Sequence, residues 1–433
     1  MFCPTCGAPD AAGHFCTRCG AAFPVADAAP ATGVSRAAAA PLPPRTVRRR
    51  LASVGIGCVG VAMAACVAFL VVASVPDPVA LGLSVVAAIV PAAVYSWVVV
   101  RLDHNEAEPR RILVAAFAWG AVGAVLFSII AGVLFQAILI TAVAEQEATF
   151  FSATIGAPLI EETFKGVALL AILVFARDEL DNVLDGIVYG ALVGLGFAMT
   201  ENILYFGAAY LEDGAAGLGR LFVVRAVVDG FGHAAYTATT GAGVGWARRQ
   251  YRRGGWRFFV PFVGWALAVG QHFLWNAGIF VVPLLQGDDA TVWSVVLVEA
   301  PLFLLPALVV LVVIASVARR REMRILHDQL AAETAGGVLT PAEHETLTSD
   351  GRRRQALAAA QRRGGRALRA RQRRFFQVTA ELAFRKYHLS RGERPKPGQR
   401  APEDAYRAEL AAIRTELAAA GVSPPTGDGS ASP

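Results

Sequence analysis

Two adjacent glutamates and a lysine lie in the middle of an apolar run from about residue 155 to residue 175. An ionisable side chain in a membrane-spanning helix costs roughly 2.5–3.5 kcal/mol on insertion scales, so such groups need partners or water. Glu161 and Lys165 are four residues apart and can pair on one face of a helix. A structural pair of this kind leaves Glu162 unexplained, so the three residues favour a polar functional site.

Further polar side chains interrupt the apolar runs that follow. Glu201 and Asn202 lie in one run, His233 in the next, and His272 with Asn276 in the run after that. The helical rise of 1.5 Å per residue places the glutamates and histidines roughly 8–20 Å from the same membrane face. Side chains at overlapping depths on four helices are expected to meet at one water-filled site.

Carboxylates, imidazoles and an amide at one site suit the hydrolysis of an amide bond by an activated water molecule. A buried carboxylate can act as the general base, and the amide of Asn276 can donate to an oxyanion. Glutamate and histidine could instead hold a divalent metal that activates the water, although no His-Glu-x-x-His motif occurs in the sequence. The remaining alternatives are a proton relay in a transporter and a scaffold without catalysis.

The elements that must hold these residues are membrane-spanning helices. Of the 433 residues, 55% are hydrophobic and 17% charged, and several apolar runs reach the roughly 20 residues that cross a bilayer. We predict an all-α polytopic membrane protein with about eight spans, in which Gly190 and Gly194 allow close helix–helix approach. The approximate spans are 51–75, 79–100, 112–142, 155–175, 183–206, 221–246, 258–285 and 292–317.

The distribution of arginine predicts the orientation in the membrane. Arginine clusters come before the first predicted span and after the second, sixth and eighth, whereas the loops after the third, fifth and seventh are acidic. Positively charged loops remain on the cytoplasmic side. We therefore predict a multi-pass plasma-membrane protein with both termini in the cytosol. Because the net charge of +6 collects in these loops, it does not indicate nucleic-acid binding.

Four cysteines form two Cys-x-x-Cys pairs near the N-terminus, Cys3 with Cys6 and Cys16 with Cys19, separated by nine residues. Two such pairs can hold one zinc ion in a tetrahedral site. A disulfide is the alternative, but the predicted cytosolic location is reducing. Four thiolates close the coordination shell, so we predict a small structural zinc ribbon over residues 1–20 without a catalytic role.

The rest of the chain divides by composition. Residues 21–50 form an Ala/Pro-rich basic linker, and residues 51–320 hold the predicted transmembrane domain. Residues 321–389 predict a basic helical extension in the cytosol, beside anionic lipid headgroups. Residues 390–433 are richer in Pro, Gly and Ser, which predicts a largely disordered tail. A helical patch near residues 404–420 interrupts that tail.

With these residues in view, the chain resembles the PrsW family of intramembrane proteases. The resemblance covers about residues 81–320, and its motifs are specific in combination although weak singly. The motifs are Glu161-Glu162-Thr-Phe-Lys165, Asp185-Gly186-Ile-Val-Tyr189-Gly190 continued by Gly196-Phe197-Ala198-Met-Thr-Glu201-Asn202, His233 with Thr237, and His272-Phe-Leu-Trp-Asn276.

The resemblance implies a glutamic-type membrane-embedded peptidase, in a wider group that includes the membrane CAAX prenyl endopeptidases. It also implies a membrane-protein substrate, for which a single-span anti-sigma factor is the natural candidate. The expected partners are this substrate and the lipid bilayer. Structural zinc in the N-terminal ribbon is the one expected cofactor, with no metal assumed at the catalytic site.

The same resemblance assigns roles to individual residues. Glu161 or Glu162 is the base, and Lys165 orients or neutralises one of them. Adjacent helical residues point about 100° apart, so one glutamate is expected to face the substrate, and Glu161 is favoured. His272 with Asn276 holds the tetrahedral intermediate, and the other residues support them. The full predicted catalytic set is Glu161, Glu162, Lys165, Glu201, Asn202, His233, His272 and Asn276.

Overall fold

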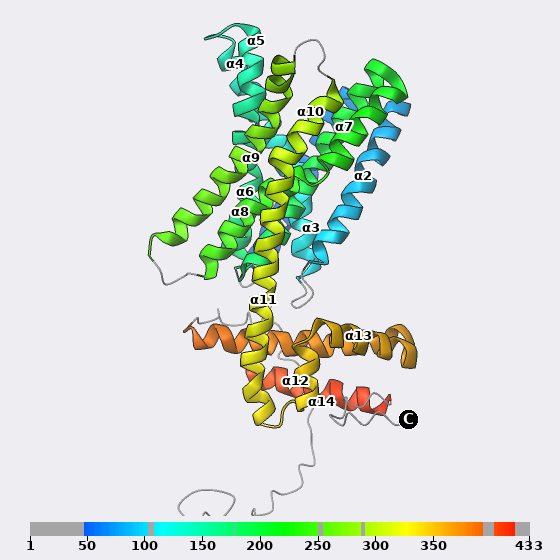
Figure 1. Cartoon of the computed structure of the whole chain (residues 1–433), viewed down its shortest axis with the longest axis vertical. Helices are drawn as coiled ribbons and strands as arrows, with labels where there is room; N and C mark the ends of the chain where they lie inside the picture. The colour runs from blue at the N-terminus through cyan, green and yellow to red at the C-terminus, as the bar shows by residue number, and fades with distance from the viewer. Residues whose placement is uncertain are drawn as a thin grey trace, which may run out of the picture. The chain divides into compact units, whose positions relative to one another are not determined.

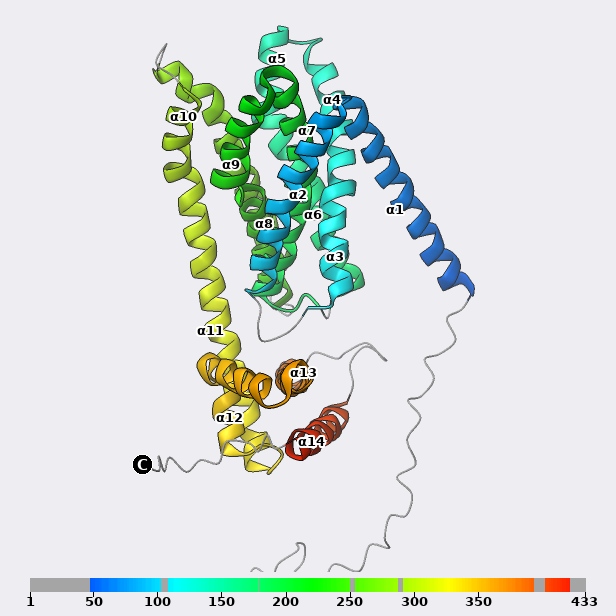
Figure 2. The same cartoon turned by 90° about the vertical axis from the view of Figure 1, so that its right-hand side faces the viewer.

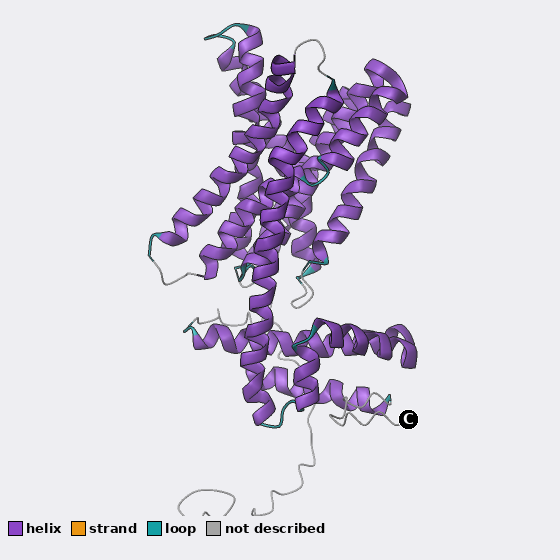
Figure 3. Ribbon diagram, viewed as in Figure 1, coloured by secondary structure: helices purple, strands orange, loops and turns teal. Residues whose placement is uncertain are grey.

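The computed structural model describes residues 47–102, 108–177, 179–249, 254–286, 291–392 and 402–420. Within these ranges the secondary structure is helical and contains no strand (Figure 3). The predicted zinc-ribbon cysteines, Cys3, Cys6, Cys16 and Cys19, lie outside the described residues, so the ribbon stays a prediction.

Long helices, some interrupted by short π-helical turns, make up the apolar part of the chain (Figure 1). Its elements are α1 (Val47–Ser74), α2 (Pro78–Val100), α3 (Arg110–Ala118), η1 (Trp119–Ala124), α4 (Val125–Leu139), α5 (Glu145–Phe151), η2 (Ser152–Gly156), α6 (Ala157–Phe175), α7 (Val183–Phe222), η3 (Val223–Val228), α8 (Gly232–Arg249), α9 (Trp256–Gln286), α10 (Val292–Glu299), η5 (Ala300–Leu304) and α11 (Leu305–Ala335). The chain divides into two compact units, residues 1–59 and residues 60–433. The elements from α2 onward belong to the second unit.

Six stretches of the described chain are long and apolar enough to cross a membrane. They lie in α1, α2, α3–α4, α7–α8, α9 and α10–α11. The predicted count of eight differs for two reasons. The α7–α8 stretch contains two helices, and α6 carries three charged residues, Glu161, Glu162 and Lys165, that lower its hydropathy. The fold class, an all-α polytopic membrane protein, is confirmed.

The chain reverses direction inside the element α7. Gly214 has φ +62° and ψ −149°, a left-handed conformation that suits glycine. The rings of Phe206 and Phe222, one on each side of this turn, pack with their centroids 6.0 Å apart. The two arms of α7 therefore form a helical hairpin, which agrees with the predicted turn between the fifth and sixth spans.

The helix of the predicted sixth span, residues 221–246, is interrupted in the structure. The returning arm of the hairpin ends in η3, and the chain leaves the helix at residues 229–231 before α8 begins. The sequence Asp229-Gly230-Phe231-Gly232 places two glycines within three residues, and glycine destabilises a helix by about 1 kcal/mol. The break puts His233 in the first turn of α8.

Glycines set the distance between α7 and α8. A Cβ atom at Gly194 would lie 2.2 Å from the carbonyl oxygen of His233, and one at Gly186 would lie 2.0 Å from that of Gly241. Gly190 makes a similar approach to α8. Rows of small residues four apart allow membrane helices to pack this closely. The row fixes the backbone of His233 against α7.

The helices that follow the apolar part form a second hydrophobic cluster with the C-terminal half of α11 (Figure 2). They are α12 (Pro341–Leu347), α13 (Asp350–Ser390) and α14 (Glu403–Ala419). Leu330, Leu382 and Leu410 are fully buried in this cluster. Helices α12 and α13 lie in the predicted extension, and α14 lies on the predicted helical patch.

Candidate active site

Lys165 on α6 is fully buried and makes three polar contacts. Its Nζ lies 3.2 Å from Glu161 Oε2 and 2.8 Å from Glu162 Oε1 on the same helix, and 2.9 Å from His233 Nδ1 on α8. An ammonium group carries three hydrogens, so each contact uses one. Lys165 pairs with Glu161 as the four-residue spacing predicts. We call Lys165, Glu161, Glu162 and His233 the Lys165 cluster.

The two adjacent glutamates have different surroundings. The Glu162 side chain is 0% exposed, accepts a hydrogen bond from Thr237 Oγ1 at 3.0 Å and lies 3.2 Å from His272 Nδ1. The Glu161 side chain keeps 12% exposure and lines a cavity. Glu162 therefore links α6 to α8 and α9, whereas Glu161 faces open space.

His233 connects the lysine to a second acidic group. Because Lys165 donates to Nδ1, the proton of the neutral ring lies on Nε2, which donates to Glu201 Oε2 at 3.0 Å. Glu201 also pairs with Arg225 at 2.5 Å, and Arg225 Nε donates to Asn202 Oδ1 at 2.7 Å. The sequence-based set omitted Arg225. Its signal was an arginine inside an apolar run, eight residues before His233.

His272 on α9 faces both glutamates. Its Nδ1 lies 3.2 Å from Glu162 Oε1, and its Nε2 lies 4.0 Å from Glu161 Oε2. The Glu162 carboxylate holds the ring proton on Nδ1, which leaves Nε2 as an acceptor. A separation of 4.0 Å exceeds a direct hydrogen bond and suits one bridging water. Tyr236, which the sequence-based set also omitted, stacks on this ring with centroids 5.1 Å apart.

Asn276, the predicted oxyanion donor, contacts the backbone of another helix. Its Nδ2 donates to the carbonyl oxygen of Ala153 at 2.9 Å. Ala153 lies in η2, and a π-helical turn frees a backbone carbonyl that must find a partner inside a membrane. The contact ties α9 to the helical run that carries Glu161. Asn276 is therefore near the site but is not bonded to the Lys165 cluster, and its oxyanion role stays a prediction.

A cavity of about 380 Å³ lies beside Glu161 and Glu201. Residues of α4, α5, η2, α6 and α7 form its walls, and most are apolar or small, including Gly132, Phe135, Gly156, Phe197 and Leu204. Binding pockets for small ligands and side chains have volumes of about 300–1,000 Å³. An apolar segment that enters this cavity meets the carboxylate of Glu161.

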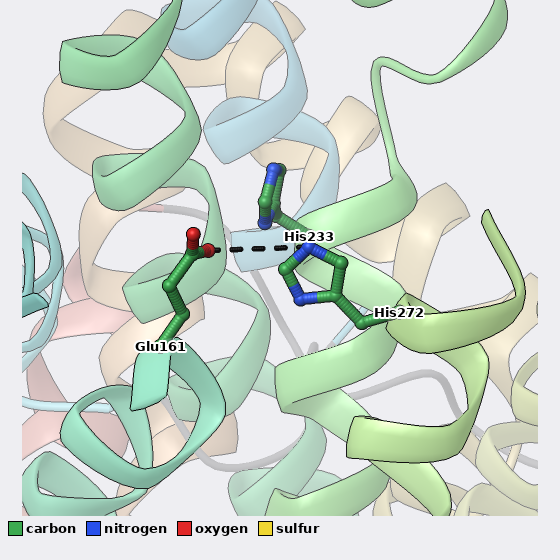
Figure 4. A group of neighbouring side chains, drawn as sticks. All are labelled: Glu161, His233 and His272. Atoms are coloured by element: carbon green, nitrogen blue, oxygen red, sulfur yellow. Dashed lines mark ion pairs between the residues drawn. The ribbon is translucent and has the colours of Figure 1, made fainter. Parts of the chain in front are cut away.

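Glu161, His233 and His272 are candidate metal ligands, because one donor atom from each lies within 4.8 Å of the others (Figure 4). Two histidines and a glutamate form a known catalytic zinc set, whose ligands about 2.0–2.1 Å from the ion are roughly 3.4 Å apart. In this structure the Lys165 ammonium bonds Glu161 and His233, and both nitrogens of His233 are engaged. The ligands as placed do not fit a metal, which would require Lys165 to withdraw.

Comparisons with known proteins match the segment that contains this site. Residues 108–319 match the family described as PrsW family intramembrane metalloprotease. The chain is 29% identical over 194 residues to Protease PrsW of Geobacillus kaustophilus, across 42% of this chain and 78% of that relative. It is 35% identical over 107 residues to Protease PrsW of Bacillus subtilis, across 24% of this chain and 44% of that relative.

A third relative, Protease PrsW of Oceanobacillus iheyensis, is 31% identical over 104 residues, across 24% of this chain and 45% of that relative. No solved structure gives a significant match to the chain. The matched segment contains the Lys165 cluster, Glu201, Arg225 and His272. Residues 108–319 therefore form a PrsW-family domain, and the chain is a multi-pass, membrane-embedded peptidase.

Proposed function

We propose that this chain hydrolyses a peptide bond within a membrane protein, using a water molecule activated by Glu161 and His272. The observation that carries the proposal is the 4.0 Å separation of Glu161 Oε2 and His272 Nε2, beside an apolar cavity. Both atoms are acceptors, so one bridging water can donate a hydrogen to each. The lone pairs of that water then point away from the two bases.

Glu161 acts as the general base in this mechanism. The water oxygen bonds to the carbonyl carbon, one of its protons passes to Glu161, and the same proton is later given to the leaving amine when the C–N bond breaks. Glu162 holds the tautomer of His272, and Lys165 balances the charge of the two carboxylates. The second amide hydrogen of Asn276 is the donor that we assign to the oxyanion.

The substrate that the cavity favours is an apolar segment of a membrane protein. The walls beside Glu161 are mainly apolar, and the cavity lies between helices of the apolar part of the chain. We take a single-span anti-sigma factor as the candidate substrate because of the family resemblance. We place the protein in the plasma membrane with both termini in the cytosol, since the arginine-rich loops would then lie on the cytoplasmic side.

A metal-dependent peptidase is the second candidate. The grouping of Glu161, His233 and His272 favours it, and so does the description of the matched family as metalloproteases. If Lys165 withdrew, these three residues would hold a divalent ion, which would supply Lewis-acid activation of water.

The test is cleavage of candidate single-span membrane proteins by the purified full chain in lipid vesicles. Wild type is compared with Glu161→Gln and Glu162→Gln, each with and without a chelator. We expect Glu161→Gln to fold normally and to lose about 10²–10⁴-fold in kcat, the usual contribution of a general base. The chelator should leave wild-type activity unchanged.

Two results would redirect the proposal. Loss of activity with the chelator supports the metal-dependent candidate, provided that a Cys3→Ser/Cys6→Ser variant shows that any ribbon zinc is dispensable. Equal behaviour of wild type and both glutamine variants would instead support a scaffold or transporter. An ion-flux measurement in the same vesicles separates those two.

A further inference from the structure

Three buried polar atoms behind the histidines have no hydrogen-bond partner among the described residues. They are Asp229 Oδ1, Tyr236 Oη and Glu299 Oε1. The three residues are 6%, 2% and 1% exposed. A buried polar group without a partner costs about 1–3 kcal/mol, and no lipid can supply the missing bond.

The three atoms belong to one region. Tyr236 packs in a cluster with Val228, which precedes Asp229, and with Ala300, which follows Glu299. Tyr236 and Glu299 also both lie against α9, where the Tyr236 ring stacks on His272 and a Cβ atom at Gly278 would lie 2.0 Å from Glu299 Oε1. The group therefore joins the break before α8 to the end of α10.

This region adjoins the candidate site through the Tyr236 ring. The Tyr236 ring is stacked on His272 at 5.1 Å and meets His233 edge-on at 5.9 Å. The described residues that line the cavity include Glu161 but not Tyr236 or either histidine. The cavity that we assign to the substrate and the group of unpartnered polar atoms are thus formed by different residues.

Hydrolysis consumes one water molecule for each bond cleaved, so a site with an apolar substrate cavity needs another source of water. The oxygen and one hydrogen of that water enter the new carboxyl group, and the other hydrogen enters the new amine. Buried waters occur where two to four polar groups converge. Unpartnered buried polar groups commonly mark such waters.

We propose that Asp229, Tyr236 and Glu299 enclose a pocket of ordered water that supplies the hydrolytic water to His272 and Glu161. This inference rests on the proposed function, because it names the source of the water that function requires. Glu299 is the last residue of the eight-residue helix α10 and forms one end of the pocket. The Tyr236 hydroxyl passes water around the His272 ring.

Hydroxyl-radical footprinting of the full chain in lipid vesicles tests the pocket without any substrate. Radicals form from water, so a buried tyrosine is labelled only where water is present. Tyr189 is the matched control, because it is 0% exposed and its hydroxyl bonds Glu108. We expect Tyr236 to be labelled several-fold faster than Tyr189 in the wild type. Equal rates would overturn the pocket, and this wild-type result does not depend on the folding of any variant.

Glu299→Leu then tests the supply of water. We expect this variant to lower the Tyr236 labelling to the rate of Tyr189 and to lower kcat at least about tenfold with KM unchanged. Glu299→Gln keeps a polar side chain and should retain more of both. Loss of labelling with unchanged kcat would overturn the supply of water by this pocket. If the wild type cleaves no substrate, the proposed function fails, while the labelling still decides whether the pocket is hydrated.

Discussion

Ion pairs of the same kind occur in two regions of this molecule, the Lys165 cluster and the helices α11–α14. Glu161 and Lys165 are four residues apart on one helix, and so are Glu403 and Arg407. The residue types and spacings are alike, so spacing alone does not separate a catalytic cluster from a surface pair. The surroundings of the pairs make the difference.

The exposed fraction of the paired side chains differs strongly between the two regions. The Lys165 side chain is 0% exposed, whereas those of Arg371 and Glu416 are 50% and 51% exposed. An exposed ion pair contributes about 0–1 kcal/mol. Removing one partner of a buried pair costs about 3–5 kcal/mol, because the other charge stays buried and uncompensated. Similar substitutions should therefore have very different effects in the two regions.

The largest effect is expected from Lys165→Met. This change leaves two buried carboxylates without their ammonium partner and removes the donor to His233 Nδ1. We expect the free energy of unfolding to fall by about 3–5 kcal/mol, with loss of peptidase activity. Denaturant unfolding in mixed micelles measures this loss of unfolding free energy. A loss below about 1 kcal/mol would show that the cluster is hydrated like a surface pair.

A smaller but more selective effect is expected from the adjacent glutamates. Glu162→Gln should lower the free energy of unfolding by about 2–4 kcal/mol, since the residue is fully buried among charged and polar partners. Glu161→Gln should lower it less, by about 1 kcal/mol, since Lys165 keeps its contacts with Glu162 and His233 and the glutamine can still accept a hydrogen bond from it. The free energies of unfolding of the two variants, measured under the same conditions, test this difference. Equal losses would contradict the separate roles of Glu162, which links α6 to α8 and α9, and Glu161, the general base.

Arg225→Met probes the outer part of the site, where the Glu201 side chain keeps 19% exposure. We expect a loss of about 2–3 kcal/mol in unfolding free energy, because Glu201 retains only the bond from His233. In a double variant with Glu201→Gln, the loss should be smaller than in Arg225→Met alone. A double variant as unstable as the sum of the singles would contradict the pairing.

Glu333 is the intermediate case in the second region. It is 4% exposed and bonds Arg407 at 2.9 Å and Lys386 at 2.6 Å, both of which reach solvent. Glu333→Gln should lower the free energy of unfolding by about 1–2 kcal/mol and leave cleavage intact. Thermal unfolding and cleavage are both measured. Loss of cleavage with normal folding would show that α11–α14 act on the site.

The smallest effect is expected from Arg371→Ala, which breaks the exposed pair with Glu416. Its unfolding free energy should stay within about 0.5 kcal/mol of the wild type, and added salt should reduce that difference further, because salt screens exposed charges. A loss above about 1 kcal/mol would remove the contrast between the two regions.

Sequence patterns predicted the parts of the fold that depend on composition and short-range spacing. Apolar runs located the helices, and glycines four apart predicted a close helix–helix contact, which the structure shows between α7 and α8. The Glu161–Lys165 spacing placed an ion pair on one helix face. These features depend on few residues and on the geometry of single helices, so no tertiary structure was needed to infer them.

Other features of the site depend on which helices meet, and the sequence did not predict them. Arg225 joins Glu201 only because the hairpin at Gly214 folds one arm of α7 onto the other. Tyr236 joins the site because the break at residues 229–231 sets the rotation of α8. A hydropathy profile contains neither the turn nor the rotation.

The π-helical turn η2 has a consequence for how this chain can change in evolution. A π-turn is one residue longer than the α-turn that it replaces, and one residue rotates a helix by about 100°. Deleting a residue in η2 would turn α5, including Thr149 of the cavity wall, while α6 stays fixed by Lys165. Single insertions and deletions in η2 can therefore alter substrate selection while the catalytic residues of α6 keep their orientation.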